Sequence, residues 1–152
     1  MKTFVLVFAV LVTVSLSFSQ STPSISPIQD FKGNTVEFGP KIHPILHVIR
    51  AHNGMDFIVR QGTAVVATAD GIVKEARTVE NYGIVVRIQH AKGIQTFYAH
   101  LSSLAVKKGA HVSQGQVIAY SGNTGLSSQP HLHYEVIDAG VRVNPRDFLA
   151  NK

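Results

Sequence analysis

The chain has 152 residues, of which 45% are hydrophobic and 15% are charged, and it has no cysteine. This length suits one compact domain with its own core and is too short for two ordinary domains. The composition argues against a disordered chain. Without cysteine there are no disulfides and no thiolate metal ligands, so any metal site must use His, Asp or Glu. The Lys and Arg residues are scattered, with no helix-turn-helix or zinc-finger pattern, so we expect no nucleic-acid partner.

Residues 1–19 have the pattern of a signal peptide. Lys2 gives a basic start, the stretch 4–16 is almost continuously apolar, and Ser17-Phe18-Ser19 places small residues at the two positions that a signal peptidase reads. The apolar run of about 13 residues is shorter than the roughly 20 of a membrane-spanning helix. We therefore expect an exported protein, periplasmic or secreted, with no stable membrane insertion after cleavage.

Residues 20–35 are expected to form a flexible leader, because the stretch 21–27 is rich in Ser, Thr and Pro. Removal of Lys2 with the signal lowers the basic count from 14 to 13 against 9 acidic residues, which leaves a net charge of +4. A mildly cationic exported protein favours an anionic polymer such as a cell wall.

Short β-rich runs separated by glycine-containing turns dominate the rest of the chain, which we expect to form one domain over 36–150. Asp70-Gly71 between two such runs predicts a hairpin, and Lys92-Gly93 lies in a second predicted turn. The pattern predicts a mainly β fold, a single compact antiparallel β-sheet or sandwich domain with very little helix. The expected strands are 57–59, 63–68, 72–79, 84–90, 94–100, 117–120, 132–137 and 141–143.

Only two stretches suggest helix. The stretch 101–106 is expected to form one turn. Asn144-Pro145-Arg146-Asp147 has the pattern of a helix start, with Asn as the cap and Pro in the first turn.

The stretch His131-Leu132-His133-Tyr134-Glu135 is the most informative of the histidine-containing segments. In a strand, the two histidines and the glutamate lie on one face, and Leu132 and Tyr134 lie on the other, toward a core. Two imidazoles on one face can flank one metal ion or one substrate. The glutamate can orient a metal ligand or stay an exposed carboxylate.

His52 and Asp56 lie on either side of Gly54, which permits a tight bend that lets the two side chains converge. An imidazole and a carboxylate are suitable zinc ligands, and a catalytic zinc site keeps one position open for water. His100 ends a predicted strand, where it can project over a cleft. From the residues alone, His131 and His133 are equally eligible as the third ligand.

The remaining histidines carry less information. His43 precedes Pro44 and is expected to shape a loop at the site. His47, His90 and His111 are expected at the surface or at strand ends.

The stretch 38–148 contains eight motifs in an order that resembles a known family, the lysostaphin-type (LytM-like) peptidoglycan endopeptidases. This resemblance implies a compact antiparallel β fold with a substrate groove across the sheet. The motifs are Phe38-Gly39, His43-Pro44-Ile45, His52-x-Gly54-x-Asp56, Ala69-Asp70-Gly71-x-Val73, Tyr98-Ala99-His100-Leu101, Gly115-Gln116-x-Ile118-Ala119, Ser121-Gly122-x-Thr124-Gly125 and Pro130-His131-Leu132-His133-Tyr134-Glu135.

The resemblance also implies a role for each candidate residue. His52, Asp56 and His133 would bind one zinc ion per chain, and His131 and His100 would assist catalysis. The implied activity is hydrolysis of peptide bonds in peptidoglycan stem peptides or cross-bridges by a zinc-activated water, and we expect a monomer. Bonds between a D-amino acid and a diamino acid and bonds in glycine bridges both remain open.

Two alternatives compete with this interpretation. One is a non-catalytic member of the same fold that binds the wall or activates other hydrolases. The other is a carrier or sugar-transport-type β sandwich, suggested by a weak repeat around Gly62 and Gly109. The second lacks a modifiable lysine in a tight turn and would have no use for an export signal.

Overall fold

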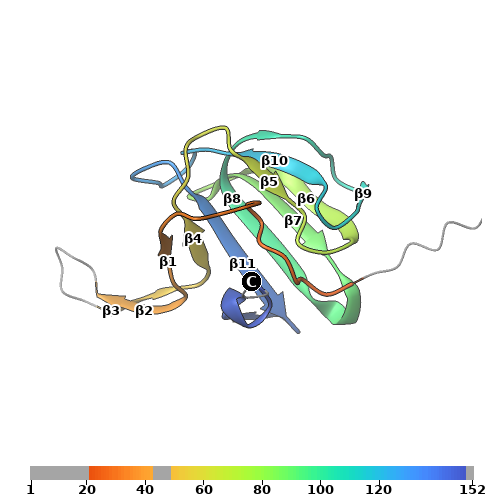
Figure 1. Ribbon diagram of the computed structural model, residues 1–152, viewed down its shortest axis with the longest axis horizontal. Coiled ribbons are helices and arrows are strands. Elements are labelled where there is room, and N and C mark those ends of the chain that lie inside the picture. The colour runs from red at the N-terminus through yellow and green to blue at the C-terminus, as the bar shows by residue number, and fades with distance from the viewer. Residues whose placement is uncertain (1–20, 43–48, 150–152) are drawn as a thin grey trace, which may run out of the picture.

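The computed structural model describes residues 21–42 and 49–149, and nearly all of its regular structure is β (Figure 1). All strand pairs are antiparallel, so the expected mainly β antiparallel fold is confirmed. Two 3₁₀ turns, η1 (Ala91–Gly93) and η2 (Pro145–Asp147), are the helical elements of the described chain, and none is long and apolar enough to cross a membrane. The strands are β1 (Thr35–Val36), β2 (Gly39–Ile42), β3 (Ile49–His52), β4 (Met55–Phe57), β5 (Ala64–Val66), β6 (Gly71–Val79), β7 (Gly83–Gln89), β8 (Gln95–Leu104), β9 (His111–Val112), β10 (Val117–Ser121), β11 (Leu132–Asp138) and β12 (Val141–Val143).

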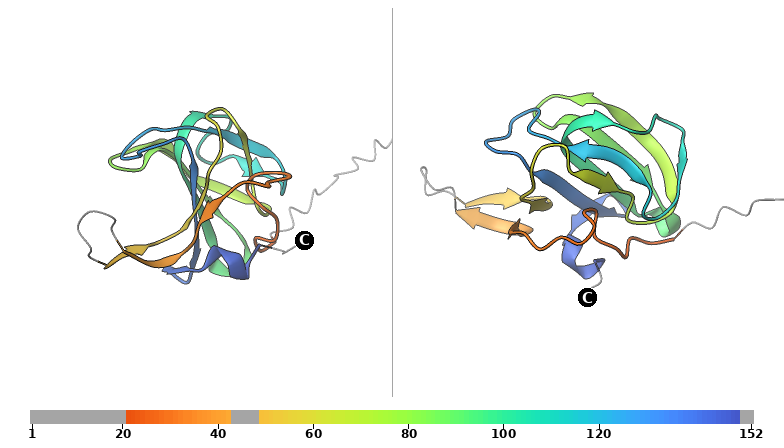
Figure 2. Two further views of the ribbon diagram at one scale, coloured as in Figure 1. Left: turned by 60° about the vertical axis from the view of Figure 1, so that its left-hand side comes forward. Right: turned by 45° about the horizontal axis from the view of Figure 1, so that its top comes forward.

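The main sheet has the order β1-β4-β11-β8-β7-β6-β9. Strand β10 pairs with both β5 and the second half of β8, so the sheet folds over onto a second layer (Figures 1 and 2). Side chains that alternate along each strand fill the space between the layers. The buried residues of this core are Ile28, Met55, Phe57, Val65, Ala67, Val73, Val86, Ile88, Ile94, Tyr98, Leu101, Val112, Ile118, Ala119, Leu132, Tyr134, Val136 and Leu149.

Two of the local predictions are wrong. Asp70-Gly71 does not close a hairpin, because β5 pairs with β10 while β6 pairs with β7 and β9. The Asp70 carboxylate instead accepts a hydrogen bond from the backbone N–H of Gln114 at 2.7 Å, which ties this turn to the β9–β10 connection. The stretch 101–106 is not a helical turn, because β8 continues to Leu104 and pairs there with β10.

Two other local predictions are confirmed. Lys92 and Gly93 form the turn between β7 and β8 with positive φ angles of 56° and 78°. Asn144 caps η2, since its side-chain oxygen accepts a hydrogen bond from the backbone N–H of Arg146 at 3.1 Å.

The described part of the expected leader runs across the second layer and is packed against it (Figure 1). Pro23, Pro27 and Ile28 are buried. The Pro27 carbonyl accepts a hydrogen bond from the Val66 N–H at 2.9 Å, and the Ser24 N–H donates to the Thr68 carbonyl at 3.1 Å. The apolar residues among the serines and prolines therefore hold a segment that composition alone predicts to be flexible. The predicted signal peptide, His43 and His47 lie outside the described residues.

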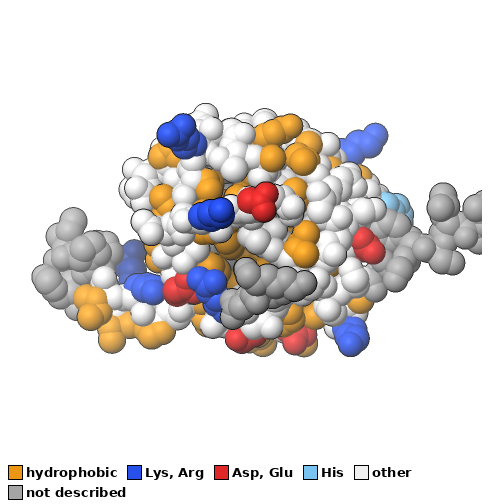
Figure 3. Space-filling view, in the orientation of Figure 1, with side chains coloured by type: hydrophobic (Ala, Val, Ile, Leu, Met, Phe, Trp, Pro, Cys, Tyr) orange, Lys and Arg blue, Asp and Glu red, His pale blue; other side chains and the backbone are white. Residues whose placement is uncertain are grey.

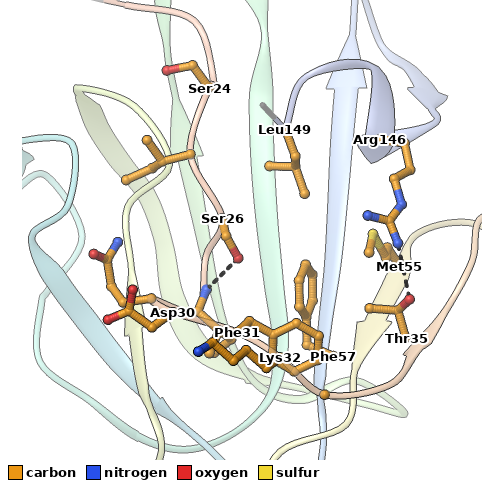
Figure 4. Close-up of a pocket in the computed structure, with 14 residues that line it drawn as sticks. Ser24, Ser26, Asp30, Phe31, Lys32, Thr35, Met55, Phe57, Arg146 and Leu149 are labelled. Carbon is orange, nitrogen blue, oxygen red and sulfur yellow. Dashed lines mark hydrogen bonds between the residues drawn. The ribbon is translucent and has the colours of Figure 1, made fainter. Parts of the chain in front are cut away.

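The leader and the end of the chain enclose a cavity of about 670 Å³ (Figure 4). Phe31, Met55, Phe57 and Leu149 line it, and Arg146 reaches over it to Thr35. Because Met55 and Phe57 flank Asp56 on β4, this cavity lies on the face of the sheet opposite to the Asp56 side chain.

His90 lies just beyond the end of β7, which is one of its two expected positions, and its side chain is buried, with 1% of its surface exposed. Its Nδ1–H donates to the Asp70 carbonyl at 2.8 Å, and its Nε2 lies 2.7 Å from the Thr96 hydroxyl. Burial lowers the pKa of His90 below its ordinary value of 6.5, and the hydrogen bond to the Asp70 carbonyl opposes this only in part.

The lowered pKa predicts how His90 contributes to stability as the pH changes. The unfolded imidazole takes up a proton more readily than the folded one, so this contribution is present above pH 6.5 and is lost as the pH falls toward the folded pKa. One such group changes the free energy of unfolding by at most about 1.4 kcal/mol per pH unit.

We expect His90→Gln to lose stability less steeply than the wild type as the pH falls below 6.5. Denaturant unfolding of both metal-free proteins across this range measures the two slopes. All other histidines are common to both proteins, so parallel curves would contradict the prediction.

Candidate metal centre

Three strands bring His52, Asp56 and His133 together. His133 on β11 lies directly opposite Asp56 on β4, so both side chains lie on the same face of the sheet. His52 ends β3 and is brought over this face by the bend at 53–54. A Cβ at Gly54 would lie 2.5 Å from the Tyr134 carbonyl oxygen and 2.8 Å from the His133 ring, so only glycine allows this close approach.

The three side chains converge on one point. The Asp56 Oδ1 atom lies 2.7 Å from His133 Nδ1 and 3.1 Å from His52 Nε2, and these two ring nitrogens are 3.3 Å apart. One ligand atom from each residue lies within 4.8 Å of the others, a separation that a single metal ion can bridge.

The outer contacts of both rings determine which nitrogen faces the centre. His52 donates from Nδ1 to the Glu37 carbonyl at 2.8 Å, and His133 donates from Nε2 to the Glu135 carboxylate at 3.1 Å. Each neutral ring therefore presents a lone pair to the Asp56 carboxylate. Three acceptors that face one another require a cation between them, and two imidazoles with one carboxylate are a donor set that suits zinc. The residues present therefore fit the metal.

Buried charge around His133 also favours a cation. Glu135 is fully buried and pairs with Arg142 through an Nε–Oε2 contact of 2.8 Å. Burial opposes protonation of His133, but its hydrogen bonds to Asp56 and Glu135 outweigh this and raise its pKa to about 9. Burial likewise opposes ionisation of Asp56, but hydrogen bonds from His133 and His52 hold the pKa of Asp56 well below its usual range. In the metal-free protein, a proton on His133 thus supplies the positive charge that the surrounding carboxylates favour.

His131 and His100 lie beside the three converging residues. Their ring centroids are 4.7 Å apart, and His131 Nε2 lies 3.9 Å from the Asp56 carboxylate. His131 donates from Nδ1 to the Gln129 carbonyl, and His100 donates from Nδ1 to the Thr124 carbonyl, both at 2.8 Å. Both rings therefore keep the Nε2 lone pair free for proton exchange. Burial lowers the pKa of His100, which favours its neutral form.

His100 has a backbone conformation that its residue type rarely adopts, with φ of +58°. The register of β8 against β7 shifts between Tyr98 and Leu101, which marks a β-bulge at His100. Bulges of this kind redirect a side chain near a functional site, and surrounding contacts must hold the strained conformation. The N–H of His100 donates to the Tyr82 carbonyl at 2.9 Å, and the two rings stack with a centroid separation of 6.3 Å.

Thr124 holds the bulge from the loop that precedes β11. Its hydroxyl donates to the Leu101 carbonyl at 2.6 Å and accepts from the Ile84 N–H at 3.0 Å. Its own carbonyl accepts the hydrogen bond from His100 Nδ1. One residue therefore connects β7 and β8 at the bulge and also orients the His100 ring.

The structure thus brings all five sequence-predicted site residues together. Glu135 is hydrogen-bonded to His133. Of the two roles expected for this glutamate, the structure therefore supports orienting a ligand residue rather than an exposed carboxylate. His111 is exposed on β9, as expected. Sequence reasoning missed the contacts of Tyr82, Thr124 and Arg142. The Thr124-Gly125 motif is the one sequence feature that points to the loop before β11, in which Thr124 lies.

Comparisons with known proteins identify the family and the fold of this chain. The sequence model described as Peptidase family M23 matches residues 50–145. Over 108 residues, the chain is 47% identical to DD-carboxypeptidase/endopeptidase Mpg of Neisseria meningitidis serogroup B, covering 71% of this chain and 25% of that protein. It is 46% identical over 108 residues to peptidoglycan DD-endopeptidase ShyA of Vibrio cholerae, covering 70% of this chain and 25% of that protein. The chain thus spans about a quarter of the length of both curated relatives.

Solved structures show the same fold. A zinc-containing peptidase from Vibrio cholerae matches with a TM-score of 0.76 and 34% identity, over 82% of this chain and 39% of that chain. The catalytic domain of lysostaphin from Staphylococcus simulans matches with a TM-score of 0.69 and 31% identity, over 76% of this chain and 91% of that chain.

The convergence of His52, Asp56 and His133 predicts which substitutions cause a loss of bound zinc. We expect about one zinc ion per chain in the wild type. His52→Ala and His133→Ala should lose most of it, because each removes a lone pair from the centre. His131→Ala should keep it, as should the control His111→Ala on β9. Metal analysis after dialysis measures the zinc content, and full zinc occupancy in His133→Ala would refute the ligand assignment.

The contacts of Thr124 predict a loss of stability in Thr124→Val, which removes a hydroxyl that both donates and accepts. We expect the free energy of unfolding to fall by about 1–3 kcal/mol, because the Leu101 carbonyl and the Ile84 N–H lose their partner. The matched control is Thr78→Val, at an exposed position of β6. Equal unfolding curves for the two variants would show that the hydroxyl does not hold the bulge.

Proposed function

Because this chain belongs to peptidase family M23, we propose that it is a zinc-dependent endopeptidase that hydrolyses peptide bonds of peptidoglycan. The resemblance to the lysostaphin-type endopeptidases that its motifs indicate is confirmed. The observation that carries the proposal is one cation site made of three convergent acceptors, with two histidines whose free Nε2 atoms lie beside it.

His52, Asp56 and His133 would hold the zinc ion. When bound, zinc acidifies a water molecule toward neutral pH and polarises the carbonyl of the scissile bond. The Glu37 carbonyl and the Glu135 carboxylate fix the orientation of the two imidazoles, so that their lone pairs are directed before the metal arrives.

His131 and His100 would handle protons next to the reacting carbonyl. The proton on Nδ1 of each ring is held by a backbone carbonyl, so exchange takes place at Nε2. A neutral Nε2 can take up a proton from the nucleophile and return it to the amine that leaves. The lowered pKa of His100 keeps this group in its neutral form near pH 7.

The substrate class follows from the relatives that share this domain. Both curated relatives named above carry DD-endopeptidase or DD-carboxypeptidase/endopeptidase in their names. We therefore favour a bond in the cross-linked stem peptides of peptidoglycan over a bond in a glycine bridge. Action on the wall requires export, which the pattern of residues 1–19 predicts.

The proposal predicts clearing of purified peptidoglycan in a zymogram, and chelation of the zinc should abolish it. His131→Ala and His100→Ala should each lower hydrolysis by about 10²-fold or more while the zinc is retained. The matched control is His111→Ala, which should keep full activity because His111 lies on β9.

Mass spectrometry of the released fragments identifies the bond that is cut. Clearing that persists after complete zinc removal would contradict the metal mechanism. A zinc-loaded wild type that releases no fragment would instead support the non-catalytic member of the fold.

A further inference from the structure

The β2–β3 hairpin is an arm that projects from the metal centre. It forms a separate two-stranded sheet and extends away from the main sheet (Figures 1 and 2). Its second strand ends at His52, so one of the three convergent residues is also the base of the arm.

The register of the arm determines which residues share a face with His52. Gly39 lies opposite His52, and Lys41 lies opposite Arg50, with no shift between them. Because side chains alternate along a strand, Lys41 and Arg50 lie on the same face of the arm as the His52 imidazole.

The opposite face of the arm is apolar. Ile42 lies opposite Ile49 there, and the two residues are 70% and 73% exposed. Figure 3 shows hydrophobic side chains along the lower side of the arm and basic side chains above them, toward the body of the protein. The charged face, rather than the apolar one, therefore continues outward from the metal centre.

Two cations directly opposite each other destabilise a strand pair unless an anion lies between or beside them. Within 21–42 and 49–149, neither Lys41 nor Arg50 makes an ion pair or a side-chain hydrogen bond. The nearest acidic candidate, Glu37, interacts with Lys41 only through its field, since its carboxylate is held by Arg146 at 2.7 and 3.1 Å. The pair is thus placed to receive an anion from outside the chain.

We propose that Lys41 and Arg50 bind a carboxylate of the substrate peptide and so help to determine which peptides the site accepts. This inference rests on the proposed function. Arg50 lies two residues from His52, a distance of roughly 7 Å along a strand, which is also the span of two residues in an extended peptide. The recognised carboxylate therefore belongs to a residue within about two positions of the scissile bond.

The test uses two synthetic cross-linked stem peptides that differ in one group. One has a free carboxylate on the diamino acid beside the scissile bond, and the other has a carboxamide there. The zinc-loaded wild type should hydrolyse the first with a kcat/KM about tenfold higher, the size expected for two exposed ion pairs. The double variant Lys41→Gln, Arg50→Gln should lose this preference while its zinc content and its hydrolysis of the amidated peptide are unchanged.

Two further variants make the result specific to these positions. Lys41→Arg, Arg50→Lys keeps both charges and should restore most of the preference. Lys74→Gln, Lys108→Gln changes the net charge equally at two exposed positions on β6 and in the β8–β9 connection, and should keep the preference. A wild type without preference, or a Lys41/Arg50 double variant that keeps it, would overturn the inference.

A binding measurement separates this inference from the proposed function. Calorimetry with zinc-loaded His131→Ala gives the affinity for both peptides without turnover, with and without the two Gln substitutions. If the wild type hydrolyses neither peptide, the proposed function fails, and the affinities still decide the inference. A preference for the carboxylate that disappears with Lys41 and Arg50 supports it, and equal affinities contradict it.

Discussion

The antiparallel pairing of β11 with β4 is the constraint on which the site depends. It places His133 directly opposite Asp56, with both side chains on the face of the sheet opposite to the larger core cluster. A shift of this register by one residue would turn His133 into the core and bring Tyr134 out. The apolar alternation of Leu132, Tyr134 and Val136 prevents that shift, because these side chains fill the space between the layers. The core thus fixes the geometry of the metal centre.

Around this pair, the remaining groups are held by contacts that leave each functional nitrogen free. Backbone carbonyls accept the Nδ1 protons of His52, His100 and His131, and a buried carboxylate accepts the Nε2 proton of His133. Preorganised imidazoles would reduce the rearrangement that binding a cation requires, which is how the fold connects to the proposed chemistry.

The sequence predicts the strands from β5 to β8 and from β10 to β12, and the face of His131 and His133, because both depend on a local period of two. It does not predict β1, β2, β3 or β9. Prediction from the sequence fails where a local structure depends on residues that are distant along the chain. Asp70-Gly71 has good turn chemistry, but turn residues do not reveal that β5 pairs with β10. The positive φ of His100 depends on Thr124 and on the bulge, and no local pattern contains it. Residues alone left His131 and His133 equivalent as ligands, because alternation specifies a face and not a distance to Asp56.

The central claim is that zinc is held by His52, Asp56 and His133, with His131 and His100 outside the metal shell. Anomalous diffraction at the zinc absorption edge from crystals of the zinc-loaded protein tests it most directly, since it locates the metal independently of activity. The account predicts one strong peak in contact with His52 Nε2, Asp56 Oδ1 and His133 Nδ1. A peak coordinated by His131 or His100 in place of one of these three residues would contradict it.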